Sequence, residues 1–416
     1  MIFFYNIFVN ALILGMRIFA LFDEKTKKGI KGRDESLSII KSSFSKSDKV
    51  IWMHAASLGE YEQGLPVLEK LKKSFPEHKI LVTFFSPSGY ENVIKKNHPA
   101  DAVCYLPFDK KAIVKEFVGN LNIELFFTVK YDYWYNLLRE LKNRNIRTYV
   151  ISALFYDRQV YFKSYGKWFV KQLRKNIDWF FHQTVSSCSL AKSIGLDNSS
   201  IAGDTRFDRV RQLRIQANTI ENIEDFIDHK KTIVFGSSWE AEEKILAHIA
   251  RENPYIKLII APHDLKRVPR LKQNFPDAVL YSEIYKNLSF PAKEAQILII
   301  DSIGLLSKLY SYAGIAVVGG GFHNAGLHNI LEAATFGVPV IFGNHYKKNP
   351  EADELIDRNG GRSFDDEVSA TTFILSLLHD DKLRHEMSGN AERFVNEKPN
   401  SSELILKHIQ RDFNIN

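Results

Sequence analysis

Short apolar runs alternate with stretches of helical periodicity from about residue 48 onward. Such runs are typical of buried strands, and apolar residues three or four positions apart are typical of one face of a helix. Their alternation predicts parallel sheets joined by crossover helices. In the first half we expect strands at 50–55, 79–85, 102–106, 124–129, 147–152 and 178–182, and helices at 65–74, 87–96, 110–120, 134–144 and 187–194.

The alternation stops over the polar stretch 214–231 and then restarts. Because 416 residues are many for one core, we interpret this stretch as a linker between two domains, 23–213 and 232–367. The pattern predicts an α/β protein with two doubly wound, Rossmann-like domains facing each other across a cleft. A helical segment, 368–416, could cross back to the first domain. In the second half we expect strands at 232–236, 256–261, 278–281, 296–300, 314–318 and 338–342, and helices at 239–252, 303–312 and 328–336.

The N-terminal residues differ from the rest of the chain. Residues 2–22 are apolar apart from Asn6, Asn10 and Arg17. The unbroken part is short for a spanning helix, and no signal-peptide cleavage site follows it. A basic flank comes next, which the positive-inside rule keeps in the cytoplasm. We interpret residues 1–22 as a membrane anchor, either a short span or an interfacial helix; a core helix is the alternative.

Composition and charge narrow the possible functions. The net charge of +7 suits anionic lipids, phosphorylated substrates and nucleic acids alike. Zinc-finger spacing, aromatic RNA-binding signatures and long basic arms are absent, so we expect no nucleic-acid partner. The histidines lack metal-binding spacing, and neither G-x-S-x-G nor a Walker lysine loop occurs. We therefore expect no metal and no cofactor.

The most informative loop lies between the strand that ends near His54 and the helix that follows. It places the carboxylate of Glu60 at the carboxyl end of a parallel strand, where α/β sheets bind their ligands. Ser57 and Glu60 also have the spacing of a capping box, in which the carboxylate only bonds backbone at the helix start. The loop alone favours the capping role, and the rest of the chain favours a role of Glu60 in catalysis.

Two further segments of the first half combine charge with aromatic side chains. Residues 130–136 follow a predicted strand and offer groups for a sugar acceptor, or else form an aromatic helix start packed on the sheet. Residues 158–181 interleave basic and aromatic residues. This pattern suits an amphipathic helix on a lipid surface, and equally a solvated helix with its aromatic face in the core.

Four loops of the second half follow predicted strands, so they should meet at one edge of the sheet. In the first, Ser237 and Ser238 could present backbone N–H groups to a phosphate or simply cap a helix. The second offers Pro262 and His263, although a single loop histidine is usually a surface residue. The fourth, polar and containing Asn349, could line the same pocket or form an ordinary turn.

The third of these loops is the strongest candidate for a ligand-binding site. Glycines 319–321 follow an apolar strand and let backbone approach a ligand closely. Asn329 then lies near a helix start that suits a phosphate, and Glu332, one turn later, could accept hydrogen bonds from a ribose. A dinucleotide site is not indicated, because the third glycine of G-x-G-x-x-G is missing.

Together these segments resemble the family of 3-deoxy-D-manno-octulosonic acid (Kdo) transferases, which act on lipid A precursors. Residues 54–60, HAASLGE, resemble the family's most distinctive element, and 203–208 resemble its interdomain signature. Residues 236–243 are similar to its GST-type loop, and 328–332 to its HNPLEP element. Order and spacing match from residue 1 to about 400.

The chain departs from the family pattern at three places. The family's E-T-E-x-W-P-N appears as KYDYWYN at 130–136, which keeps one carboxylate, Asp132. The family's Pro-Arg-His at 262–264 lacks the arginine, and Ala333 replaces a proline. We interpret the chain as a divergent branch of the family, because the candidate base and the asparagine–glutamate pair remain.

The resemblance implies a GT-B glycosyltransferase that moves Kdo from CMP-Kdo to a lipid A precursor, lipid IVA, in lipopolysaccharide synthesis. The reaction would be inverting and metal-independent, at the cytoplasmic face of the inner membrane, with its lipids as partners. The first domain would bind the acceptor and the second CMP-Kdo, with Glu60 as general base. The implied acceptor residues are Ser57, Gly59, Asp132, Trp134 and Asn136, and the implied donor residues are Ser237, Ser238, Pro262, His263, Gly320, Gly321, His328, Asn329, Glu332 and Asn349.

Two other functions stay open. One is an isomerase of the same architecture, of the UDP-sugar epimerase kind, which would need no anchor or lipid and would bind UDP. The other is a non-catalytic protein that binds a nucleotide sugar or lipid.

Overall fold

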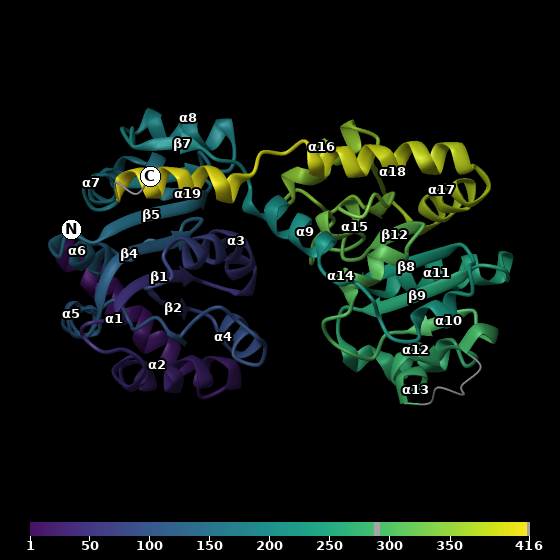
Figure 1. The fold of residues 1–416 in the computed structure, drawn as a ribbon, viewed down its shortest axis with the longest axis horizontal. Helices are drawn as coiled ribbons and strands as arrows, with labels where there is room; N and C mark the ends of the chain where they lie inside the picture. The colour runs from purple at the N-terminus through teal and green to yellow at the C-terminus, as the bar shows by residue number, and fades with distance from the viewer. Residues whose placement is uncertain (287–291, 414–416) are drawn as a thin grey trace. The chain divides into compact units, whose positions relative to one another are not determined.

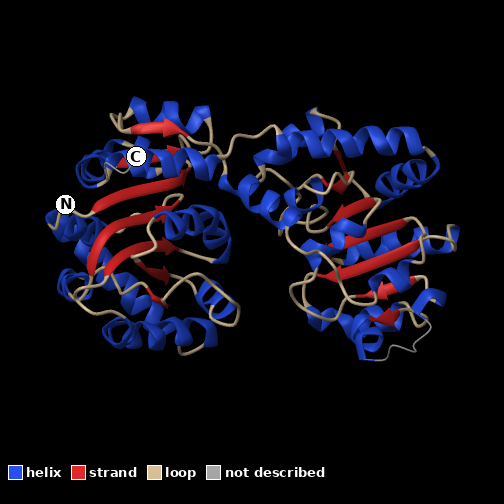
Figure 2. Ribbon diagram, in the orientation of Figure 1, coloured by secondary structure: helices blue, strands red, loops and turns tan. Residues whose placement is uncertain are grey.

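The computed structural model describes residues 1–286 and 292–413. Its contacts divide the chain into two compact units: unit 1 is Met1–Arg209 with Pro399–Asn416, and unit 2 is Val210–Lys398. In each unit a parallel sheet is covered by helices (Figures 1 and 2). This architecture confirms the predicted α/β class with two doubly wound sheets.

Unit 1 is built on a seven-stranded parallel sheet. Its strands are β1 (Lys49–Ala55), β2 (Lys79–Phe84), β3 (Ala102–Tyr105), β4 (Asn122–Val129), β5 (Arg147–Ala153), β6 (Trp179–His182) and β7 (Ser199–Ile201), in the order β3-β2-β1-β4-β5-β6-β7. Residues 50–53 of β1 are buried, because helices cover both faces of a parallel sheet. His54 pairs with Thr83 of β2 and Thr128 of β4, so it lies toward the carboxyl end of three central strands.

The helices of unit 1 come from both ends of the chain. They are α1 (Ile2–Phe19), α2 (Glu24–Ser43), α3 (Leu58–Ser74), α4 (Pro87–Val93), α5 (Lys111–Gly119), α6 (Tyr135–Asn143), η1 (Val160–Phe162), η2 (Ser164–Gly166), α7 (Lys167–Asn176), α8 (Val185–Ser193), α9 (Thr205–Ile215), which continues into unit 2, and α19 (Ser401–Asp412). Figure 1 shows α19, at the yellow end of the chain, beside β5. There the Tyr149 hydroxyl donates to Asp412 at 2.6 Å, which fixes the C-terminal helix on unit 1.

Helix α1 is long and apolar enough to cross a membrane by length and composition, with a mean hydropathy of 1.8. Only Val9 and Ile13 of this helix are buried. Its first turn is nevertheless fixed to unit 1 by polar contacts. The Tyr5 hydroxyl donates to Asp109 at 2.6 Å, and the Asn136 amide donates to the Asn6 side chain at 3.1 Å.

Unit 2 repeats the same architecture. Its strands are β8 (Thr232–Ser238), β9 (Lys257–Pro262), β10 (Val279–Leu280), β11 (Ile297–Ile299), β12 (Ile315–Val318), β13 (Val340–Gly343) and β14 (Gly361–Phe364), in the order β10-β11-β9-β8-β12-β13-β14. Its helices are α10 (Ile223–Ile227), α11 (Glu240–Glu252), η3 (Leu265–Arg267), α12 (Val268–Asn274), α13 (Tyr281–Lys286), η4 (Ala292–Glu294), α14 (Leu306–Leu309), η5 (Tyr310–Tyr312), α15 (Leu331–Ala334), α16 (Pro350–Asp357), α17 (Glu367–His379) and α18 (Asp381–Asn396).

Three helical predictions were wrong in extent. Residues 158–181 form two 3-10 turns, η1 and η2, before α7, because the chain folds back so tightly that a Cβ on Gly166 would collide with the Val160 carbonyl. The predicted helix 303–312 is shortened to α14 and η5, and 328–336 to α15. Both shortened helices follow glycine-containing loops at strand ends, where backbone conformation is set by the loop.

Candidate functional site

Glu60 lies in the first turn of α3, directly after β1. Ser57 occupies the N-cap position but makes no side-chain hydrogen bond to the helix backbone, and its hydroxyl instead donates to the Glu60 carboxylate. The Lys130 ammonium lies 4.0 Å from the other carboxylate oxygen, and the Glu60 side chain is 16% exposed. The capping box is therefore not formed between these two residues, and the carboxylate remains accessible.

A second carboxylate of unit 1, Asp132, is oriented by a buried histidine. His54 Nε2 lies 2.6 Å from Asp132 Oδ2, and because a carboxylate only accepts hydrogen bonds, Nε2 carries a proton. On the other side of the ring, Nδ1 lies 2.9 Å from the Thr83 hydroxyl, which accepts a hydrogen bond from Trp52. His54 is fully buried whereas Asp132 is 22% exposed, so the chain of bonds ends on a partly exposed carboxylate.

The other predicted acceptor residues have different surroundings. Gly59 lies in the first turn of α3, and a Cβ built there would have open space apart from Ser57. Trp134 stacks on Phe85 with ring centroids 5.3 Å apart. Asn136 is 5% exposed, and its amide donates to the Asp109 carbonyl and to the Asn6 side chain, so it joins α6 to α1.

In unit 2, the carboxyl end of β8 contains a buried hydroxyl. Ser238 is fully buried, and its Oγ has no hydrogen-bond partner in the described part of the chain. The preceding residue, Ser237, has a φ of 52°, and a Cβ on Gly319 would collide with its carbonyl oxygen. The carboxyl end of β8 and the loop after β12 are thus packed backbone to backbone, as expected for neighbouring parallel strands.

The glycines after β12 are required by the packing of the next loop. Gly320 has a φ of 89°, which favours glycine. A Cβ on Gly321 would lie 2.6 Å from the Gly343 nitrogen at the end of β13. His345 donates its backbone N–H to the Gly321 carbonyl at 2.8 Å, which joins the two loops.

Aromatic and imidazole rings from three of these loops form a cluster. Trp239 stacks on His263, with ring centroids 4.4 Å apart. Trp239 and His323 form a T-shaped pair, with ring centroids 4.3 Å apart. The ring of His328 lies 4.7 Å from that of His263. Burial first, and then the neighbouring imidazoles, lower the pKa of His328 to about 4. Sequence reasoning missed Trp239 and His323, although both occur in loops that it had selected.

The lowered pKa predicts that acid destabilises the fold through His328. Between pH 4 and 6.5 the folded state binds fewer protons here than the unfolded chain, so stability falls as the pH drops through this range. Buried His182 of unit 1, whose pKa is also lowered to about 4, adds the same trend. Between pH 7 and pH 4.5 the melting temperature should fall less steeply for the His328→Asn variant than for the wild type. An unchanged slope would contradict the assignment.

The pair Asn329 and Glu332 is joined as the sequence suggested. The Asn329 amide donates to the Glu332 carboxylate at 3.0 Å, and its carbonyl oxygen accepts from the Leu331 backbone N–H at 3.1 Å. The loop side chain is therefore fixed at the start of α15. Asn349 is instead the N-cap residue of α16, and its amide donates to the Glu351 carboxylate at 3.1 Å.

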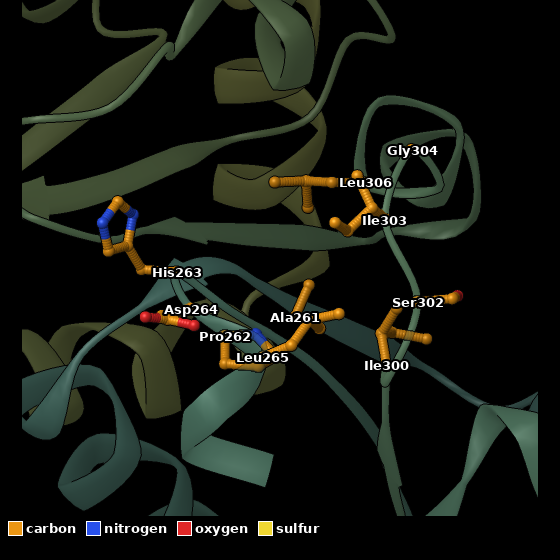
Figure 3. A pocket seen from close by; sticks show the side chains of 10 residues that line it. All are labelled: Ala261, Pro262, His263, Asp264, Leu265, Ile300, Ser302, Ile303, Gly304 and Leu306. Carbon is orange, nitrogen blue, oxygen red and sulfur yellow. The ribbon is translucent and has the colours of Figure 1, made fainter. Parts of the chain in front are cut away.

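A cavity of about 370 Å³ lies at the carboxyl ends of β9 and β11. Figure 3 shows His263 and Asp264 on one side of it and Ile303 and Leu306 on the other. The residues after β11, including Ser302, were not singled out from the sequence. Their signal was a polar pair and a glycine directly after a predicted strand, Asp301-Ser302-Ile303-Gly304.

Among residues 1–286 and 292–413, no group of three or more histidine, cysteine, aspartate or glutamate side chains is placed to hold a metal ion.

Comparison with known proteins finds relatives of one kind for both a part and most of the chain. The family model described as 3-deoxy-D-manno-octulosonic-acid transferase (kdotransferase) matches residues 31–209. A 3-deoxy-D-manno-octulosonic acid transferase of Aquifex aeolicus is 27% identical over 345 residues, which cover 81% of this chain and 88% of the relative. A bifunctional glycosyltransferase/methyltransferase of Fusobacterium nucleatum is 29% identical over 76% of this chain, which spans about half (50%) of the relative's length.

The fold has relatives among solved structures as well. UDP-GlcNAc 2-epimerase from Neisseria meningitidis, solved with UDP-GlcNAc, superimposes with a TM-score of 0.61 at 16% identity, over 87% of this chain and 100% of that one. At this identity the likeness supports the GT-B-like fold and does not extend to the reaction. The family model and the relatives in sequence are more specific: over much of its length the chain is similar to 3-deoxy-D-manno-octulosonic acid transferases.

Proposed function

We propose that this protein transfers Kdo from CMP-Kdo to a lipid A precursor. The observation that carries the proposal is the setting of Glu60, an accessible carboxylate at the carboxyl end of β1 that makes no cap to its own helix. It belongs to the segment 54–60, which resembles the family's most distinctive element. Similarity to the Kdo transferases supports Kdo as the transferred sugar, and the donor and the acceptor are our inference from that similarity.

In the proposed reaction Glu60 acts as general base. It accepts the proton of an acceptor glucosamine hydroxyl while that oxygen forms a bond to the anomeric carbon of Kdo. The bond from this carbon to the phosphate oxygen of CMP breaks on the opposite face, so the configuration inverts. A correctly placed base accounts for roughly 10²–10⁴-fold of the rate. Ser57 and Lys130 contact the carboxylate from two sides and orient it for this step.

The groups of unit 2 would bind the CMP portion of the donor. The unpartnered Ser238 hydroxyl and the backbone at Gly320 are suited to a phosphate. His263 lines the cavity of Figure 3 and stacks on Trp239, so the pair offers aromatic rings on which a pyrimidine could stack. Glu332, oriented by Asn329, would accept hydrogen bonds from the ribose.

The proposed acceptor places the enzyme at a membrane. Many apolar side chains of α1 are exposed, including Phe3, Phe4 and Phe8. Such a face inserts into the boundary between head groups and acyl chains. We therefore place the protein at the cytoplasmic face of the inner membrane, in contact with its lipids.

The decisive experiment incubates the purified full chain with CMP-Kdo and a lipid A precursor and measures the mass of the lipid. The expected result is the addition of Kdo, and the mass also counts the sugars added. An unchanged lipid mass, with CMP-Kdo intact and the protein folded, would contradict the proposal.

Nucleotide-induced stabilisation separates this function from the isomerase alternative. A ligand at 100 times its Kd stabilises the folded state by about 2.7 kcal/mol. We expect CMP to raise the melting temperature of the full chain in a saturable manner and UDP to leave it unchanged. Stabilisation by UDP and not by CMP would favour the epimerase-like reaction. The Trp239→Ala variant should require about tenfold more CMP for the same shift, because one stacking partner is lost.

A further inference from the structure

Unit 1 contains an apolar cavity of about 660 Å³ that the proposed chemistry leaves unused. It is lined by α1, by the loop after β4 and by residues 160–169. We propose that this cavity binds an acyl chain of the glycolipid acceptor. The inference rests on the proposed function for the identity of the acceptor, and its first test below is independent of catalysis.

The size and lining of the cavity suit a hydrocarbon chain. Its volume lies within the roughly 300–1,000 Å³ of typical ligand pockets. Phe4 and Phe8 of α1 face it from one wall, and Trp168 and Phe169 of α7 from another. Binding of a hydrocarbon chain to such a lining is favourable because its methylene groups are removed from water. A polar ligand would find few hydrogen-bond partners there.

Helix α1 is held in place as a wall of this cavity. Tyr5 lines the cavity and also donates its hydroxyl to Asp109, and its ring lies 5.4 Å from that of Tyr135. The next residue, Asn6, accepts a hydrogen bond from Asn136. These contacts fix the first turn of α1 against unit 1, so the helix and the cavity form a single surface.

One end of the cavity adjoins the candidate acceptor site. Asp132 lines the cavity and is the carboxylate that His54 orients. Two residues before it, Lys130 lies 4.0 Å from Glu60. A chain bound here would therefore carry its polar head toward the two carboxylates at the carboxyl edge of the sheet.

A basic hollow beside the cavity favours an anionic lipid over an uncharged one. Tyr161 lines the cavity and also this hollow of about 470 Å³, whose lining includes Lys163, Lys167, Lys171 and Arg174. An amphiphile with phosphate groups on a sugar head and acyl chains below it matches the charge and the apolarity of the two hollows together. We therefore favour the acceptor over bulk lipid as the occupant.

The test compares two phenylalanines of α1 with nearly equal exposure. Phe8 is 59% exposed and lines the cavity, whereas Phe19 is 58% exposed and does not line it. Each is replaced by serine in the full chain, and binding of a long-chain fluorescent fatty acid is titrated in detergent. Removing one aromatic contact from the cavity should weaken binding about tenfold for Phe8→Ser and leave Phe19→Ser unchanged.

A second arm uses transfer and membrane binding. With the acylated acceptor, Phe8→Ser should raise KM about tenfold with little change in kcat, and with a deacylated acceptor it should match the wild type. Both variants should bind vesicles of anionic phospholipid equally, because each loses the same apolar area. Equal weakening of fatty-acid binding by both variants, or by neither, would overturn the proposal. The expected split in fatty-acid binding without Kdo transfer to any lipid would instead refute the proposed function and keep the acyl-chain site.

Discussion

The Glu60→Gln variant should lose about 10²–10⁴-fold of kcat for Kdo transfer while binding CMP as tightly as the wild type. Glutamine keeps the shape of the side chain and can still accept the hydrogen bond from Ser57, but it cannot take up the proton of an attacking hydroxyl. The measurement is the rate of lipid mass increase at saturating CMP-Kdo, together with the CMP-induced shift in melting temperature.

A matched control exists on the same helix. Glu62 pairs with Arg209 at 2.7 Å and its side chain is 39% exposed. The Glu62→Gln variant removes a carboxylate two residues away and should keep transfer within about twofold, since exposed ion pairs contribute little. Substantial turnover by Glu60→Gln would leave Glu60 with a structural role only, and equal losses in both variants would indicate a fold defect.

The central strands of both sheets were predictable because their sequences are continuous apolar runs. The predicted strands 50–55 and 124–129 correspond to β1 and β4, which are buried on both faces. The edge strands β7 and β14 were missed. Their sequences, Ser199-Ser200-Ile201 and Gly361-Arg362-Ser363-Phe364, lack an apolar run, because an edge strand has only one neighbour and less buried surface.

Contacts within the candidate sites were less predictable than the elements that carry them. The loops could be selected because each follows an apolar strand, and parallel strands end at one edge of the sheet. The sequence did not indicate that His263 stacks on Trp239, since those residues belong to loops after different strands. Nor did it separate Asp132, which is partly exposed, from Asn136, which is buried against Asp109 only four residues later.

Asn136 packs against Asp109, whose buried carboxylate accepts three hydrogen bonds from two separate helices, α1 and α6. Its carboxylate accepts from the Tyr5 hydroxyl at 2.6 Å and from the backbone N–H groups of Asn136 and Leu137 at 2.8 Å. Burial raises the pKa of this carboxyl, and its three donors oppose the rise. One side chain thus satisfies the first turn of α6 and fixes the first turn of α1.

Asp109→Ala should destabilise unit 1 by about 3 kcal/mol, because it leaves two backbone N–H groups and one hydroxyl buried without an acceptor. For a unit of this size, a loss of that order lowers the melting temperature by roughly 6–12 °C. Calorimetry of the full chain measures the shift. Limited proteolysis should also cut α1 faster in the variant, since the helix loses its main polar attachment.

The control for this prediction is Asp101→Ala. Asp101 also accepts a backbone hydrogen bond, from Ile80 at 2.7 Å, but it is exposed, so water can replace it and the loss should stay below about 1 kcal/mol. Equal shifts in melting temperature in the two variants would mean that the burial of the Asp109 hydrogen bonds does not contribute to stability. A lower melting temperature of Asp109→Ala without faster cleavage of α1 would mean that apolar contacts of α1 are enough to hold this helix. The wall of the cavity would then not depend on the hydrogen bond between Tyr5 and Asp109.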